Sequence, residues 1–213
     1  VGFSMANLGR SPERKLFWWS HMTAVVNEYR NKSVGLRLKM AQRSEALAAG
    51  IQEVRWTFDP LQALNAHFNI HKLGITVRTY EENVYGYSKS PLHWGLPTDR
   101  FVAEWQLDSA RVNQRLGGEE HAMILRDFDR LVRINGPDRG PDSEPSLGLE
   151  ESPLLLEIPN DIKRLKETDL DRAKICQDRI RAACQHYFKA GYAITDFILV
   201  DRPRIQALYV LER

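Results

Sequence analysis

Residues 16–43 constrain this chain more than any other stretch, because they read as a strand, a short turn and a helix in immediate succession. The apolar run 16–26 predicts the strand, the polar turn 30–35 contains a glycine, and a helical pattern starts directly after it. From residue 30 to residue 43 there are five basic residues and no acidic one. Peptide N–H groups in such a turn, together with the positive end of the helix, attract anions. The segment therefore predicts a site for a phosphate-bearing ligand, with an ordinary helix start as the alternative.

Length and composition narrow the class of protein. The chain has 213 residues, 43% of them hydrophobic, which suffices for one large or two small domains with a real core. A net charge of +2 is not that of a protein that coats nucleic acid or membrane surfaces. No apolar run approaches the ~18 residues of a membrane span. The two cysteines, Cys176 and Cys184, lie about two turns apart on one predicted helix, so we expect a reduced, cytoplasmic protein with no metal.

The chain predicts a mixed α/β fold. Residues 1–107 read β-β-α-β-α-β-β, with helices at 35–49 and 60–72 and Asp59 as the expected N-cap of the second. The first helix carries two apolar seams, one of which contains Val34, Leu38, Ala41 and Ala48. Because the sequence starts in a strand-like pattern without an initiator Met, we expect further elements upstream of residue 1.

The second half predicts an α/β extension. It contains part-helical residues 109–130, a Pro- and Gly-rich linker near 135–153, a strand at 154–158, a long helix at 169–189, and a closing hairpin from strands 192–200 and 205–211. These patterns favour one unit at 1–108 and a C-terminal extension at 109–213.

Several segments together resemble one enzyme family. The order Arg30-x-x-Ser33-x-Gly35 is similar to the Gln/Arg-x-x-Gly-x-Gly/Ala acetyl-CoA signature of the GNAT acyltransferase superfamily, with Ser33 in place of the first glycine. WTFDPLQALNAHFNIHKLG (56–74) resembles the second conserved GNAT block, and GLPTDRFVAEW (95–105), LLLEIPNDI (154–162) and GYAITDF (191–197) resemble a poorly characterised bacterial subgroup of predicted GNAT acetyltransferases. The resemblance implies a GNAT-like acyl-CoA core, N-terminally truncated, with a C-terminal extension.

The resemblance also implies where a cofactor would lie. The pantetheine arm of acetyl-CoA would occupy a V-shaped gap between the strand ending at Val25 and the strand ending near Phe58. The pyrophosphate would lie on the N–H groups of the turn. The implied cofactor-binding residues are Ala24, Val25, Val26, Arg30, Asn31, Lys32, Ser33, Val34, Gly35 and Asn65.

Acyl transfer to an amine needs a base, stabilisation of the carbonyl oxygen and departure of the thiolate. His21 lies on the strand beside the expected thioester and is the candidate catalytic base, with a packed or surface histidine as the alternative. Many GNAT enzymes carry a tyrosine acid four residues before the glycine that ends the second helix, and here that position is Ile70. Asp99, Arg100, His93 and Trp94 are candidates for the acceptor side.

The sequence thus predicts an acyl-CoA-dependent N-acyltransferase that uses acetyl-CoA or another acyl-CoA as cosubstrate. Its acceptor is a small amine or a peptide amine, and neither nucleic acid nor membrane is an expected partner. The alternatives are a non-catalytic acyl-CoA-binding module and a structural α/β protein. The oligomeric state stays open, a homodimer included.

Overall fold

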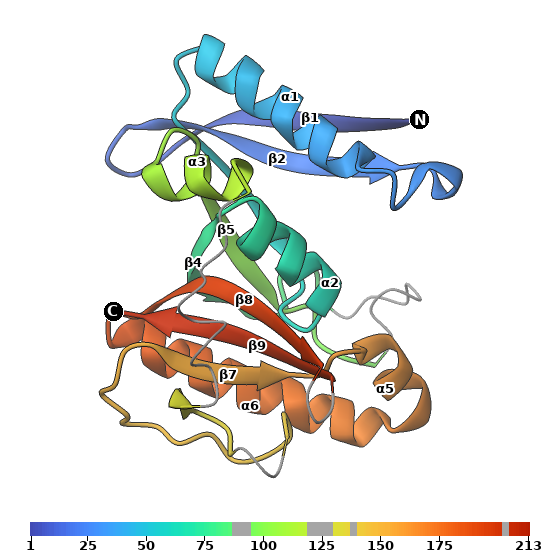
Figure 1. Ribbon diagram of the computed structural model, residues 1–213, viewed down its shortest axis with the longest axis vertical. Helices are drawn as coiled ribbons and strands as arrows, with labels where there is room; N and C mark the ends of the chain where they lie inside the picture. The colour runs from blue at the N-terminus through green and yellow to red at the C-terminus, as the bar shows by residue number, and fades with distance from the viewer. Residues whose placement is uncertain (87–94, 119–129, 137–139, 202–204) are drawn as a thin grey trace.

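The computed structural model describes residues 1–86, 95–118, 130–136, 140–201 and 205–213. Over these residues the protein is mixed α/β, as predicted, and its strands form one nine-stranded sheet in the order β1-β2-β3-β5-β4-β8-β9-β7-β6 (Figure 1). The strands are β1 (Gly2–Arg10), β2 (Leu16–Val25), β3 (Glu53–Phe58), β4 (Thr76–Glu81), β5 (Arg100–Gln106), β6 (Val132–Arg133), β7 (Leu154–Ile158), β8 (Ala193–Asp201) and β9 (Ile205–Glu212). The helices are η1 (Asn27–Tyr29), α1 (Val34–Ala48), α2 (Ala63–Ala66), η2 (His67–Lys72), α3 (Ala110–Leu116), α5 (Ile162–Thr168) and α6 (Leu170–Lys189).

The first two strands and α1 form one arm of the molecule, at the top of Figure 1. β1 and β2 pair antiparallel over their whole length, with a bulge between Met5 and Ala6, and α1 packs across β1, β2 and β3. The prediction of an apolar seam through Ala41 and Ala48 is wrong, since both are exposed. The buried residues of α1 are Val34, Lys39, Gln42 and Ala46, so half of its buried face is polar.

The segment between β3 and β4 forms a helix that starts later than predicted. Asp59 is not its N-cap: the Asp59 carboxylate accepts a hydrogen bond from the Leu61 N–H (2.8 Å), and α2 begins only after Gln62. The helix then continues as the π-helical segment η2 and ends before Gly74, whose φ of 74° needs a glycine. Ile70 is fully buried on this helix, among core side chains.

The second half continues the same sheet. Val77 of β4 pairs with Ile194 of β8, β8 and β9 pair antiparallel as the expected hairpin, and α6 packs against β4 and β7 (Figure 1). The helix α5 was missed by the sequence analysis. One hydrophobic cluster runs through both halves, and Phe101 of β5 contacts Tyr209 of β9 at 5.4 Å between ring centroids. The boundary proposed at residue 108 stays a prediction.

A buried ion pair reinforces the connection between the halves. Asp196 on β8 binds Arg115 of α3 and lies 3.1 Å from Nδ1 of His71 in η2, and the Asp196 and Arg115 side chains are each 3% exposed. Asp99, a candidate for the acceptor side, is likewise engaged by Tyr80 and Arg181 within the protein. None of the described helices combines the length and apolar character needed to cross a bilayer.

Candidate functional site

The gap between β2 and β3 is the feature around which a site is built. The two strands run parallel, but they pair only at Trp18–Val54 and Trp19–Arg55. Beyond these pairs β2 continues to Val25 beside β1, and β3 continues to Phe58 beside β5. The strands therefore diverge, and each leaves one backbone edge facing the other across the gap.

The turn that follows β2 presents unpaired N–H groups at the mouth of this gap. Ser33, the residue before α1, lies in the left-handed region (φ 57°, ψ 16°), and Asn31 has φ 60°. The Ser33 side chain makes no capping hydrogen bond. The first N–H groups of a helix have no acceptor within the helix, so those of Val34 and Gly35 are free to bind an anion.

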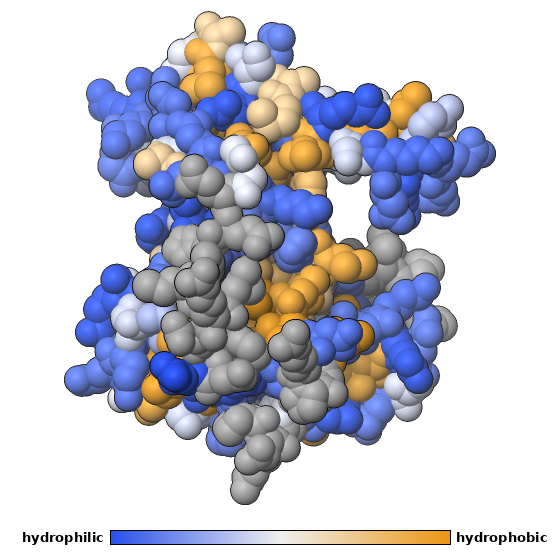
Figure 2. All heavy atoms as spheres, viewed as in Figure 1, coloured by the Kyte–Doolittle hydropathy of each residue, from blue (hydrophilic) through white to orange (hydrophobic). Residues whose placement is uncertain are grey.

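A cavity of about 840 Å³ opens at this turn. Its basic residues are Arg30 and Lys72, and no acidic side chain of the described residues lines it. The lining residues are Val25, Tyr29, Arg30, Asn31, Ser33, Val34, Gly35, Leu36, Leu64, Asn65, Phe68 and Lys72. Figure 2 shows an opening on this side of the molecule, between the arm that carries the end of β2 and the surface near α2.

A second cavity, of about 310 Å³, continues the first one into the gap between the strands. Val25, Gly35, Asn65 and Phe68 line both cavities, so the two are contiguous. The second cavity is also lined by Ser20, His21, Thr23, Lys39, Trp56, Thr57, Phe58 and Asn69. The structure thus brings together His21, Val25, Arg30, Asn31, Ser33, Val34, Gly35 and Asn65 of the residues predicted from the sequence.

The backbone of β2 corrects one expectation about the pantetheine arm. The Val26 N–H donates to the Val1 carbonyl (2.9 Å), so it is not available to a ligand. In an antiparallel ladder, backbone groups point alternately to the two sides of a strand. Val25 therefore faces away from β1, and its carbonyl accepts a hydrogen bond from Nε of Arg30 (3.4 Å). Ala24 shares the β1 side with Val26, and Lys32 is exposed on the turn.

Lys39 is the residue of this site that the sequence analysis missed. Its side chain lines the inner cavity and is only 4% exposed. Its Nζ donates to Ser20 Oγ (3.1 Å) and to Gln42 Oε1 (3.0 Å) and lies 3.6 Å from the centroid of the Trp56 ring. Burial lowers the pKa of Lys39 to about 7. Its place in the five-residue basic run gave a hint, but helical periodicity alone does not show which basic residue points inward.

The candidate catalytic residues have different surroundings. His21 is exposed and borders the inner cavity, as a base acting on an incoming amine would have to. Asn65 accepts a hydrogen bond from the buried Asn69 (3.2 Å) and lines both cavities. Ile70 is fully buried and offers no proton donor. His93 and Trp94 lie outside the described residues.

The sequence analysis also missed a histidine pair on the helix η2. His67 and His71 stack at 4.8 Å between ring centroids beside a cavity of about 390 Å³, which Lys72 and Arg115 also line. Burial and the neighbouring His71 lower the pKa of His67 to about 4. His71 is held by Asp196, which it meets only through the fold, 125 residues further along the chain.

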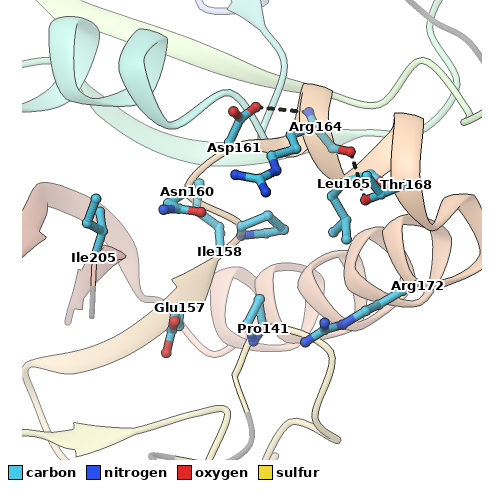
Figure 3. Close-up of a pocket in the computed structure, with 11 residues that line it drawn as sticks. Pro141, Glu157, Ile158, Asn160, Asp161, Arg164, Leu165, Thr168, Arg172 and Ile205 are labelled. Atoms are coloured by element: carbon cyan, nitrogen blue, oxygen red, sulfur yellow. Dashed lines mark hydrogen bonds between the residues drawn. The ribbon is translucent and has the colours of Figure 1, made fainter. Parts of the chain in front are cut away.

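A further cavity, of about 420 Å³, lies between the end of β7, α5 and the start of α6 (Figure 3). Two of its polar side chains bind other parts of the protein. Asp161 accepts a hydrogen bond from the Arg164 N–H at the start of α5 (3.0 Å), and Arg172 pairs with Asp142 (2.9 Å).

Comparisons with known proteins give little at the level of sequence. No protein-family model matches the chain, and no curated protein matches it. Among solved structures, it is similar to Arabidopsis thaliana Naa50 in complex with the bisubstrate analogue CoA-Ac-MVNAL, at 16% identity and a TM-score of 0.40. It is also similar to the NatC complex bound to Gag peptide and CoA, at 13% identity and a TM-score of 0.40. These matches cover 49% and 50% of this chain and 64% and 60% of the other chains, less than two thirds of either.

The left-handed turn residue generates a first prediction. A non-glycine residue in this region costs about 1–2 kcal/mol, so Ser33→Gly should raise the free energy of unfolding by roughly 1 kcal/mol. Thermal and urea unfolding measure the change. Ala49→Gly, at the C-cap of α1 with φ −83°, is the matched control and should bring no gain. A Ser33→Gly protein no more stable than the parent would contradict the strain assigned to Ser33.

Lys39 generates a second prediction, which concerns how the free energy of unfolding depends on pH. Its pKa is lower in the folded protein than in the unfolded chain, where it is about 10.4. The folded state therefore carries a penalty that is complete below pH ~7, shrinks as pH rises, and vanishes above the unfolded pKa. Lys39→Met should stabilise the protein at pH 7 by on the order of 2 kcal/mol, after the loss of two hydrogen bonds. That gain should fall by about 1.4 kcal/mol per pH unit towards pH 10.

Urea unfolding of both proteins from pH 6 to pH 10 measures this difference. The exposed Lys72 supplies the control, since Lys72→Met should shift stability little and without this pH dependence. A stability difference for Lys39→Met that stays constant from pH 7 to pH 10 would show that Lys39 has an ordinary pKa.

Proposed function

We propose that this protein is an acyl-CoA-dependent N-acyltransferase. The observation that carries the proposal is the divergence of β2 from β3 after two residue pairs, directly above the free N-terminus of α1. Two contiguous cavities fill this gap, and no acidic side chain lines either of them. This arrangement suits an elongated ligand with phosphates at one end and an uncharged, hydrogen-bonding arm.

The pyrophosphate and the pantetheine arm of coenzyme A find suitable partners in this arrangement. The pyrophosphate fits the turn, where the N–H groups of Val34 and Gly35 and the charge of Arg30 favour an anion. The pantetheine arm fits the gap, where its amides can bond the backbone edge of β2 at Thr23 and Val25. Such an arm takes the place of the missing strand pairing between β2 and β3. The thioester then comes to lie near Ser20 and Trp56, where the strands meet.

For acyl transfer, the protein has to hold the amine and the thioester in position and to supply one base. Holding an amine and a thioester together removes much of the entropic cost of the reaction. In this proposal His21, exposed at the inner cavity, takes a proton from the amine as it attacks the thioester carbonyl. Water then protonates the departing thiolate, since the helix offers Ile70 in place of a tyrosine. The acceptor would be a small amine or the amine of a peptide.

A non-catalytic acyl-CoA-binding module is the second candidate. The apolar, fully buried Ile70 favours it, because the usual proton donor is missing at that place. Both candidates bind CoA, and only the first transfers an acyl group. Incubation with acetyl-CoA and a library of amines and peptides, with free thiol as the readout, distinguishes them.

The turn provides the prediction on binding. A Cβ at Gly35 would meet Phe68 only at 4.0 Å, so a side chain there is tolerated by the fold and points into space that the ligand needs. Gly35→Glu should therefore leave the melting temperature nearly unchanged and abolish CoA binding in titration calorimetry. Gly35→Ala is the control and should bind CoA more weakly, but detectably. Unchanged CoA affinity of Gly35→Glu would place the phosphates elsewhere.

His21 provides the prediction on catalysis. His21→Ala should lower the rate of acyl transfer by about 10²–10⁴ and remove the limb of the pH–rate profile set by a group near neutral pH. The affinity for CoA should hardly change, because the base does not hold the cofactor. A His21→Ala enzyme with the parental pH–rate profile would leave His21 as a surface residue.

A further inference from the structure

The two contiguous cavities carry basic residues at their opposite ends. At the outer end, Arg30 and Lys72 line the cavity beside the start of α1. At the inner end Lys39 is the one lysine or arginine among the lining residues. No aspartate or glutamate lines either cavity. A ligand that spans both cavities thus meets positive charge at both ends.

The length of β2 indicates which part of an acyl-CoA would reach Lys39. Ser20 and Val25, which lies at the turn, are five positions apart, and at about 3.3 Å per residue this segment measures roughly 16 Å. A pantetheine arm laid along it carries its sulfur towards the point where the strands meet. Ser20 stands at that point, and its Oγ is 3.1 Å from Nζ of Lys39. The acyl group, which extends beyond the sulfur, therefore comes to the Lys39 amine.

Among the described residues, none gives Lys39 a counter-ion. Its described polar partners, Ser20 and Gln42, are uncharged, and Trp56 offers only the face of its ring. The low pKa of Lys39 has burial as its cause, with no charged neighbour contributing. If Lys39 had only a structural role, a methionine could occupy the same space without the free-energy cost of burying a charge. An amine kept at this cost on a cavity wall is typical of a functional group.

We propose that the acyl donor of this protein ends in a carboxylate, as the monothioester of a short dicarboxylic acid with CoA, and that Lys39 binds this carboxylate. The inference rests on the proposed function, since it assumes CoA in the gap. A carboxylate supplies the charge that Lys39 lacks, and a charged hydrogen bond in a buried site is stronger than one between neutral groups. A plain acetyl group would place an apolar methyl beside the amine and supply no charge to pair with it.

Two thioethers of equal chain length test this directly: S-butyl-CoA and S-(3-carboxypropyl)-CoA, which differ by a terminal methyl or carboxylate. Neither can transfer its chain to an amine, so calorimetry at pH 6.5 measures binding alone. The parent protein should bind the carboxylate analogue about tenfold tighter or more, the scale of one charge-assisted hydrogen bond. Lys39→Met and Lys39→Gln should lose or reverse this preference. Lys72→Met is the matched control and should weaken both analogues equally.

The outcomes separate the two proposals. If CoA and both analogues fail to bind, the proposed function falls, and this inference with it. If CoA binds but the parent protein prefers the butyl analogue or does not discriminate, only the inference is overturned. The inference alone is also overturned if Lys39→Met or Lys39→Gln keeps the preference for the carboxylate analogue while its thermal unfolding transition shows that the variant is folded.

Discussion

The backbone pairing of β2 with β3 ends after two residue pairs, and the rest of the site depends on that early end. β2 pairs with β1 over its whole length, while β3 pairs with β5 through six residue pairs from Glu53 to Phe58. Each strand therefore has one satisfied edge and one edge that faces the gap. Backbone N–H and C=O groups require partners when they are removed from water. An extended ligand with its own amides is a natural occupant of such a gap, because it completes both edges at once.

Several costly features gather around the same gap. Ser33 occupies a left-handed conformation without capping its helix, the first N–H groups of α1 face a cavity, and Lys39 is buried without a charged partner. Each costs the folded protein stability, and all of them lie around the cavities between β2 and β3. Strain and unpaired polar groups concentrate at functional sites. The polar buried face of α1 belongs to the same pattern, since Gln42 both accepts from Lys39 and donates to Ser20.

The order of elements could be predicted from the sequence because it rests on local patterns. Period-two alternation, the helical repeat after Ser33 and the glycine at 74 each act within a few residues, and β2, α1 and β4 appear close to their expected bounds. The sequence predictions that were wrong or incomplete concern features that depend on tertiary structure. Asp59 looked like an N-cap, yet the chain makes a turn before the helix begins. The seam through Ala41 and Ala48 is exposed, and Lys39 is buried on α1 instead through its contacts with Ser20 and Trp56. The pairing of His71 with Asp196 spans 125 residues and leaves no local signal.

The gap stays open because its two walls are supported separately. β2 is held by the β1 hairpin and by α1, whereas β3 is held by β5, which is anchored further into the molecule. The Trp105 Nε1–H donates to the Leu73 carbonyl (2.8 Å), and Phe101 packs on Tyr209 of the second half. Of the elements around the gap, α1 contacts both walls, and Lys39 is the residue of α1 that meets Ser20 on one and Trp56 on the other. The side chain at the inner end of the cavity thus also joins the strands where they separate.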